Sequence, residues 1–385
     1  RLGLAGSYVG VIVAHLIPTI PYMVRMLTSV YQGLARDYEE TSLAIDAHVS
    51  KPFEVMGWQN NIILGADYQD VDSTRSQARG TIAQANNIYD WDSDIAYPSF
   101  SYGAPTDQSL QQFGVYGQLR VKPIEPLTLI GGARVSWVDQ TSTGSIDVDE
   151  DAHFTPYAGA VYDLTNWLSA YASYTEIFLP QPEVDSTGQL IGVQTGRQYE
   201  AGLKAEFFDG GLNASVAYFN LEVSDRAEAI RGETYSNSAD ALVQGVDAQA
   251  SGEITPNLSF MAGYTYTRTE YLNTDADGEP FNTYTPEHMF HLFGKYTFSE
   301  GHALDGFYVG GGLNAFSEFS SGSIEAPGYM TVDVVAGYEF NDHFEASLVV
   351  NNVLDEKYYA RVGSSSVFNF YGEPLSAKLK LTAKY

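Results

Sequence analysis

The chain of 385 residues has no cysteine and comparatively few basic residues. Without cysteine it can form neither a disulfide framework nor a thiolate metal site. Lys and Arg number 20 against 48 Asp and Glu, and the net charge of −28 argues against a nucleic-acid partner. The chain also does not open with a basic start, a short apolar core and a cleavage site, the pattern of a signal peptide. We therefore expect a mature chain or a fragment, of a composition that fits a disulfide-free cell-envelope protein.

Apolar and polar residues alternate from Thr41 onward. In residues 377–385, Ala, Leu and Tyr occupy the odd positions, and Lys or Thr occupy the even ones. The segments 199–207 and 258–266 show the same period of two, which predicts strands with one apolar and one polar face. About sixteen such strands of about ten residues are visible, the length that crosses a bilayer when tilted.

Short and long connections alternate between these strands. The short turns are 122–126, 163–166, 209–211, 255–257 and 341–342. The long polar connections are about 69–110, 139–151, 176–196, 224–242, 270–287 and 317–327. This sorting predicts an all-β fold, a transmembrane antiparallel β-barrel of up-and-down strands. A soluble multi-sheet protein is the alternative, but it would not sort its loops in this way.

Several segments resemble the barrel of TonB-dependent outer-membrane receptors, and the likeness is strongest to the ferric-siderophore group. They are "LTNWLSAYASYTEIFLPQ" (164–181), "TGRQYEAGLKAEFFDGGLNASVAYFNLEVSD" (195–225), "PFNTYTPEHMFHLFGKYTF" (280–298), "NNVLDEKYYARV" (351–362) and "FNFYGEPLSAKLKLTAKY" (368–385). The resemblance covers about 41–385 and implies a barrel domain of the Gram-negative outer membrane. It implies binding and uptake of a ferric siderophore, with no other cofactor and no catalysis.

The family's signature near the C-terminus is matched by six residues: Asn351, Asn352, Leu354, Asp355, Tyr358 and Tyr359. We expect them to end a strand and anchor the rim. The terminal aromatic Tyr385 resembles the signal read by the barrel-assembly machinery, although Phe is usual there. Family members have an N-terminal plug inside a barrel of about 22 strands, with a segment that contacts the TonB complex. Neither is visible here, so the strands look like the C-terminal part of such a barrel. A passive porin of about sixteen strands is the alternative function.

Residues 1–40 do not follow the strand pattern. They are apolar for about thirty residues, which predicts a helical or irregular segment of membrane character. The segment resembles a fragment of the inner-membrane permease of an ABC importer, which would make the chain chimeric. A divergent N-terminal segment of the barrel is the other interpretation.

Catalytic and metal motifs are weak. The seven histidines form no recognisable Ser-His motif, and His288 and His291 should point to opposite faces of a strand. "NTDADGEP" (273–280) resembles a calcium loop, but Tyr284 stands where the bidentate Glu belongs. The acidic run at 147–151 is more typical of a solvated loop tip. We predict neither an enzyme nor a metal site.

Aromatic residues in the long loops are the candidates for ligand binding, because rigid rings bury much area at a small entropic cost. Self-packing within the loop or anchoring at the membrane rim is the competing interpretation. The candidates are Tyr89, Trp91, Tyr97, Phe100 and Tyr102 in the longest loop, joined by Tyr284, Phe316, Phe319 and Phe370.

Overall fold

The computed structural model describes residues 36–55, 57–78, 101–230, 233–274, 276–298, 301–363 and 368–383. Within these ranges the protein is all-β and has no helix, as predicted. Accordingly, no helix of the described part is long and apolar enough to cross a membrane. The expected helical or irregular N-terminal segment lies almost wholly outside the described residues, which begin with strand β1 at Arg36.

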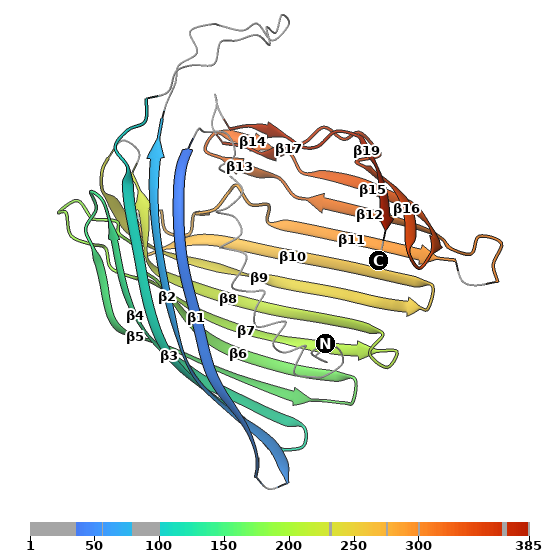
Figure 1. Cartoon of the computed structure of the whole chain (residues 1–385), viewed down its shortest axis with the longest axis horizontal. Helices are drawn as coiled ribbons and strands as arrows, with labels where there is room; N and C mark the ends of the chain where they lie inside the picture. Colours follow the sequence, from blue (N-terminus) through green and yellow to red (C-terminus); the bar gives the residue numbers. More distant parts are fainter. Residues whose placement is uncertain are drawn as a thin grey trace, which may run out of the picture. The chain divides into compact units, whose positions relative to one another are not determined.

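In the described part of the chain, fifteen strands form one large sheet. Neighbouring strands follow chain order, from β1 (blue) to β19 (red) in Figure 1. Every pairing described from β5 to β19 is antiparallel. The strands are β1 (Arg36–Val55), β2 (Trp58–Gln77), β3 (Thr106–Ile124), β4 (Leu127–Ser142), β5 (Val148–Asp163), β6 (Leu168–Leu179), β7 (Gln194–Phe207), β8 (Leu212–Ala229), β9 (Ser236–Thr255), β10 (Leu258–Leu272), β11 (His288–Thr297), β12 (Phe307–Phe316), β15 (Tyr329–Asn341), β16 (Phe344–Asn351) and β19 (Ser376–Ala383).

The chain divides into two compact units. The first consists of Arg1–Leu43, Gln69–Gln111 and Gln140–Ser145, and the second of Ala44–Tyr68, Gln112–Asp139 and Ile146–Tyr385. Strands β1 to β4 contribute to both units, whereas β5 to β19 belong to the second alone. In the first unit, Thr74 donates a hydrogen bond to Asp107 at 2.7 Å, and the backbone amide of Asp107 donates to Thr143 at 3.1 Å.

The short turns fall where the sequence predicts them, but the strands are longer than expected. Strands β7 and β8 meet at the turn 208–211, and β9 and β10 meet at 256–257. At the opposite ends, β8 and β9 continue to Ala229 and from Ser236, so the expected loop of 224–242 is mostly strand. Bilayer thickness sets a minimum for a strand, and backbone pairing continues beyond it where both neighbours remain extended.

The two faces of the sheet differ as the alternation requires. In β7, Tyr199 and Leu203 lie on the apolar face and are 52% and 41% exposed. Glu200 and Lys204 lie on the opposite, polar face, where the Lys204 Nζ is 4.6 Å from the centre of the Tyr171 ring. Large apolar side chains so uncovered on one face are typical of a sheet that is solvated there by lipid.

Two small sheets accompany the large one. Strands β13 (Phe319–Ser321) and β14 (Ile324–Ala326) form a hairpin, and β17 (Tyr359–Arg361) pairs with β18 (Phe370–Tyr371) (Figure 1). Phe319, Ala326 and Val362 form a hydrophobic cluster with exposed fractions of 7%, 0% and 2%. The two small sheets therefore share a core of their own.

Candidate functional site

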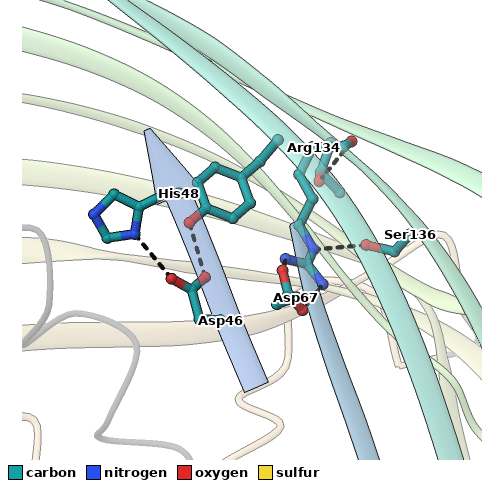
Figure 2. A network of polar contacts seen from close by, with 7 residues as sticks. Asp46, His48, Asp67, Arg134 and Ser136 are labelled. Carbon is teal, nitrogen blue, oxygen red and sulfur yellow. Dashed lines mark hydrogen bonds and ion pairs between the residues drawn. The ribbon is translucent and has the colours of Figure 1, made fainter. Parts of the chain in front are cut away.

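A polar network crosses the first strands of the sheet within the second unit. Arg134 on β4 forms an ion pair with Asp67 on β2, in which the Arg134 Nη2 donates to the Asp67 Oδ1 at 2.7 Å (Figure 2). The Arg134 Nε donates to the Oγ of the fully buried Ser136 at 2.7 Å. Both members of the ion pair are about three-quarters covered, with side-chain exposures of 26% and 22%. Such a bidentate, partly desolvated pair fixes the positions of both strands.

A second part of the network lies beside it on β1. Asp46 accepts a hydrogen bond from the Tyr116 hydroxyl at 2.8 Å, and its other oxygen lies 3.0 Å from the His48 Nδ1 (Figure 2). A carboxylate that orients an imidazole is part of many catalytic triads, but a triad also needs a nucleophile on the imidazole. The hydrogen bonds described for His48 include no serine or threonine hydroxyl. No group of three or more His, Asp or Glu side chains among the described residues could hold a metal ion.

Sequence reasoning missed this network. Arg134 and Asp67 are 67 positions apart, and β3 lies between their strands. The only signal available was the presence of charged residues at polar-face positions of otherwise apolar strands. His288 and His291 behave as their spacing predicts: His288 contacts Tyr264 on the apolar face, and His291 contacts Asn314 on the polar face.

An aromatic ladder is built on the polar face near the long-loop ends of the strands. We use this name for His291 (β11), Phe316 (β12), Tyr329 (β15) and Tyr358. Tyr358 stacks on Tyr329 with 4.1 Å between the ring centres, and Tyr329 lies 4.9 Å from Phe316. The His291 ring meets Phe316 edge-on at 5.3 Å. The ladder offers rings that are partly exposed and already held in place by one another.

The predicted ligand residues have different environments. Tyr89, Trp91, Tyr97 and Phe100 lie outside the described residues. Tyr102, in the first unit, is 49% exposed and forms an isolated bridge with Ala78. In the second unit, the exposed candidates are Tyr284 at 52% and Phe370 at 53%.

Phe319 differs from the other candidates, because it is buried in the cluster with Ala326 and Val362. Its burial argues against the predicted ligand role. The sequence placed it in a polar loop, and the β13–β14 hairpin that covers it was not foreseen.

The signature residues form a compact cluster of hydrogen bonds at the end of β16. Asn352 is 3% exposed, and its Nδ2 donates to the carbonyl oxygens of Glu356 and Glu373 at 2.9 and 3.0 Å. Its Oδ1 accepts from the Glu356 amide at 2.9 Å, and its own amide donates to Asp333 at 2.8 Å. Asp355 accepts from the amide of Leu375 at 3.1 Å. One buried amide thus joins the end of β16 to the segment that leads into β19.

The remaining signature residues surround this cluster of hydrogen bonds. Asn351 is the last residue of β16 and pairs with Ser376, and Leu354 is 60% exposed. Tyr359 stacks on Tyr371 with 4.8 Å between the ring centres. The hydrogen bond that the Tyr359 hydroxyl shares with the Tyr371 hydroxyl raises the pKa of Tyr359. Tyr385 lies outside the described residues.

The acidic run 147–151 is not the predicted loop tip, because strand β5 begins at Val148. Glu150 lies 2.8 Å from the Nδ1 of His153, which stacks on Phe178. In the segment that resembles a calcium loop, the Asn273 amide donates to Asp277 at 3.2 Å, as in an ordinary polar turn. Asp275 lies outside the described residues.

Comparison with known proteins defines the class. The family profile described as "TonB dependent receptor-like, beta-barrel" matches residues 17–353. The chain is 34% identical to the ferric-pyoverdine M114 receptor PbuA of Pseudomonas sp. (strain M114), over 94% of this chain and 47% of that one. It is 33% identical to the ferripyoverdine receptor of Pseudomonas aeruginosa, over 87% and 43% of the two chains. A crystal structure of the Pseudomonas aeruginosa receptor bound to ferripyoverdine superposes with a TM-score of 0.80 and 29% identity, over 90% and 49%.

The chain belongs to the TonB-dependent receptor β-barrel family, an outer-membrane family of Gram-negative bacteria whose members are receptors. It spans about half the length of the curated relatives that it matches. The resemblance of residues 1–40 to an importer permease is not supported, because the family match already begins at residue 17. The long apolar run suggested a helical span by composition alone.

Proposed function

We propose that the chain is the barrel part, about residues 41–385, of an outer-membrane receptor for TonB-dependent uptake of ferric siderophores. The observation that carries this proposal is the 34% identity to a ferric-pyoverdine receptor over 94% of the chain. Ferripyoverdine is therefore the first ligand to test. In this proposal the fifteen-stranded sheet is the wall of a transmembrane barrel, with its apolar face in lipid and its polar face in the lumen.

The proposed ligand contacts are aromatic side chains at the long-loop ends of the strands. In the second unit these are Tyr284, Phe370 and the partly exposed rings of the aromatic ladder, Phe316 among them. Tyr102 is the corresponding candidate of the first unit. A ferric chelate is bulky, partly planar and rich in oxygen, so stacking on rings with hydrogen bonds to tyrosine hydroxyls suits it. Phe319 is left out of this set because it is buried.

Binding of an iron-loaded chelate tests the proposal. The chain is displayed in outer membranes, and retention of radioactive iron is measured with ferripyoverdine and with free ferric citrate as the control. Binding needs no energy from a TonB complex, so it isolates recognition from transport. We expect saturable retention of ferripyoverdine alone. Equal retention of both iron forms, together with a steady ionic conductance in planar bilayers, would favour the porin alternative instead.

The contact residues are tested by single truncations in the same assay. Tyr284→Ala and Phe370→Ala should each raise the Kd for the chelate about tenfold, which corresponds to ~1.4 kcal/mol. Leu304→Ala is a matched control, because Leu304 is 44% exposed but belongs to the connection between β11 and β12 at the short-turn ends of the strands. If the control weakens binding as much as the aromatic variants do, the proposed contact set is wrong.

A further inference from the structure

Aromatic rings on the polar face lie close over glycines of the neighbouring strand. In three strand pairs the ring and the glycine are direct cross-strand partners: Tyr171 with Gly202, Phe219 with Gly245, and Tyr308 with Gly337. A Cβ added at any of these glycines would lie less than 3.0 Å from an atom of the ring. Real Cβ atoms do not approach other atoms so closely, so these rings can take up their positions only over glycine.

The same arrangement recurs in the polar network of the first strands. The Tyr116 ring covers Gly65, and the Tyr157 ring covers Gly132. The guanidinium group of Arg134 covers Gly114 in the same way. Tyrosine and arginine therefore both lie over a glycine, although their chemistry differs. What they share is the need for the space that the missing Cβ leaves free.

Crossing a glycine lets a side chain reach the second strand away. Tyr116 of β3 donates to Asp46 of β1 at 2.8 Å, and Tyr157 of β5 donates to Gln118 of β3 at 2.9 Å. Tyr308 of β12 donates to Glu345 of β16 at 2.6 Å, across β15. Arg134 of β4 pairs with Asp67 of β2. Neighbouring strands are about 4.8 Å apart, so each bond spans about 9.6 Å of sheet.

We propose that Tyr116, Arg134, Tyr157 and Tyr308 act as staples. Each staple is a side chain that bonds to the second strand away and thereby fixes the register of three consecutive strands. Gly65, Gly114, Gly132 and Gly337 are the crossing points that make the staples possible. A slip of one residue would turn every side chain of a strand to the wrong face of the sheet. A bond that joins strands 1 and 3 over strand 2 opposes a slip of any of the three.

Glycines elsewhere in the strands provide a matched comparison. A Cβ at Gly131, which is next to Gly132 but faces the apolar side, would have no atom within 4 Å. The same is true of Gly263 on β10. Alanine at these positions changes the same backbone by the same methyl group without touching a staple.

The test measures urea unfolding of the full chain in detergent, with the heat-dependent shift in gel mobility as a check that each variant has folded. Gly65→Ala, Gly132→Ala and Gly337→Ala should each raise the unfolding equilibrium constant at least tenfold, whereas Gly131→Ala and Gly263→Ala should change it less than threefold. Tyr157→Ala should reduce the harm of Gly132→Ala when the two are combined, because the ring clash is gone and only the contact with the Gly117 carbonyl oxygen, at 2.6 Å from the added Cβ, remains. Equal effects at Gly132 and Gly131 would overturn the proposal.

A milder variant separates stapling from simple packing. Tyr157→Phe keeps the ring over Gly132 and removes only the hydroxyl that reaches Gln118. We expect a threefold to tenfold rise in the unfolding constant that disappears in a Gln118→Leu background, where the hydroxyl has no acceptor. If Tyr157→Phe is as stable as the native chain, the ring only fills space and the staple does not exist. This variant also decides the matter if the alanine variants fail to fold.

Discussion

The polar face of the large sheet and the two small sheets are held together in opposite ways. On the polar face, half-covered side chains reach across glycines to partners two strands away. In the small sheets, side chains are buried against one another: Phe319, Ala326 and Val362 are at most 7% exposed. The cluster of hydrogen bonds at the end of β16 is likewise centred on a buried side chain, because Asn352 is 3% exposed.

The difference follows from what surrounds each region. In the proposed barrel the strands place their apolar residues in lipid, so the large sheet would depend on its backbone pairing and on bonds across the sheet. In the same proposal the small sheets are in water, where a two-stranded sheet is marginally stable unless it buries apolar area. The two small sheets satisfy this requirement by sharing one core.

Phe319→Ala should cause the largest loss of stability, and this loss should be limited to the small sheets. Removing a buried phenylalanine ring costs ~3 kcal/mol or more, because a cavity remains where the ring was. We expect faster amide hydrogen exchange in β13, β14 and β17, with no change in β5 to β10. Equally faster exchange in the small sheets and in the large sheet would contradict this comparison, because the two regions would then unfold together.

Tyr284→Ala is the control for this variant. Tyr284 is also an aromatic residue of the second unit, but it is 52% exposed and does not belong to the buried cluster. Its truncation should leave the exchange rates of all strands unchanged. A chelate-binding defect in Phe319→Ala should therefore come with faster exchange, and one in Tyr284→Ala should not.

Asn352→Ala should come next in size. It leaves the Glu356 amide and two carbonyl oxygens without their partner, at ~2 kcal/mol. The Asn352 backbone also has a positive φ of 49°, which asparagine tolerates better than alanine. We expect faster exchange at the end of β16 and the start of β19. Leu354→Ala, at an exposed position of the same segment, should change nothing.

Asn352→Gly separates the two contributions, because glycine accepts the positive φ but supplies no amide group. Its loss of stability should equal that of Asn352→Ala minus the backbone strain. A glycine variant as stable as the native chain would show that backbone conformation, and not the buried amide, holds the end of β16.

The strands and their faces could be predicted because they depend on nearest neighbours in sequence. The alternation in 199–207 and 258–266 fixes which residues share a face, and the turn residues at 208–211 and 256–257 fix where the strands reverse. The signature at Asn352 could likewise be read as the end of a strand. The length of β8 and β9 could not, because pairing continues past the region that the apolar pattern marks.

Contacts between distant strands were beyond sequence reasoning. Nothing near Arg134 in the sequence indicates Asp67 as its partner, because the pairing depends on β3 lying between them and on Gly114 leaving room. Phe319 was misplaced for a related reason. Its burial depends on Val362, which is remote in sequence and arrives only when β17 packs against the hairpin.

The smallest expected effect concerns the loop between β6 and β7, where one carboxylate accepts several hydrogen bonds of a tight turn. Asp185 accepts hydrogen bonds from the hydroxyl and amide of Thr187 and from the amide of Gln189, and these bonds lower its pKa below the ordinary value of 3.8. Because the folded pKa is the lower one, the turn is stabilised above pH 3.8 and loses this stabilisation only as the pH falls through the lowered value. We expect the Gln189 amide to stay protected at pH 4 and to exchange freely near pH 2. Asp185→Asn should abolish this dependence on pH while keeping an acceptor, and Thr187→Val should move the transition to higher pH. Protection that persists near pH 2 would show that other contacts hold the loop.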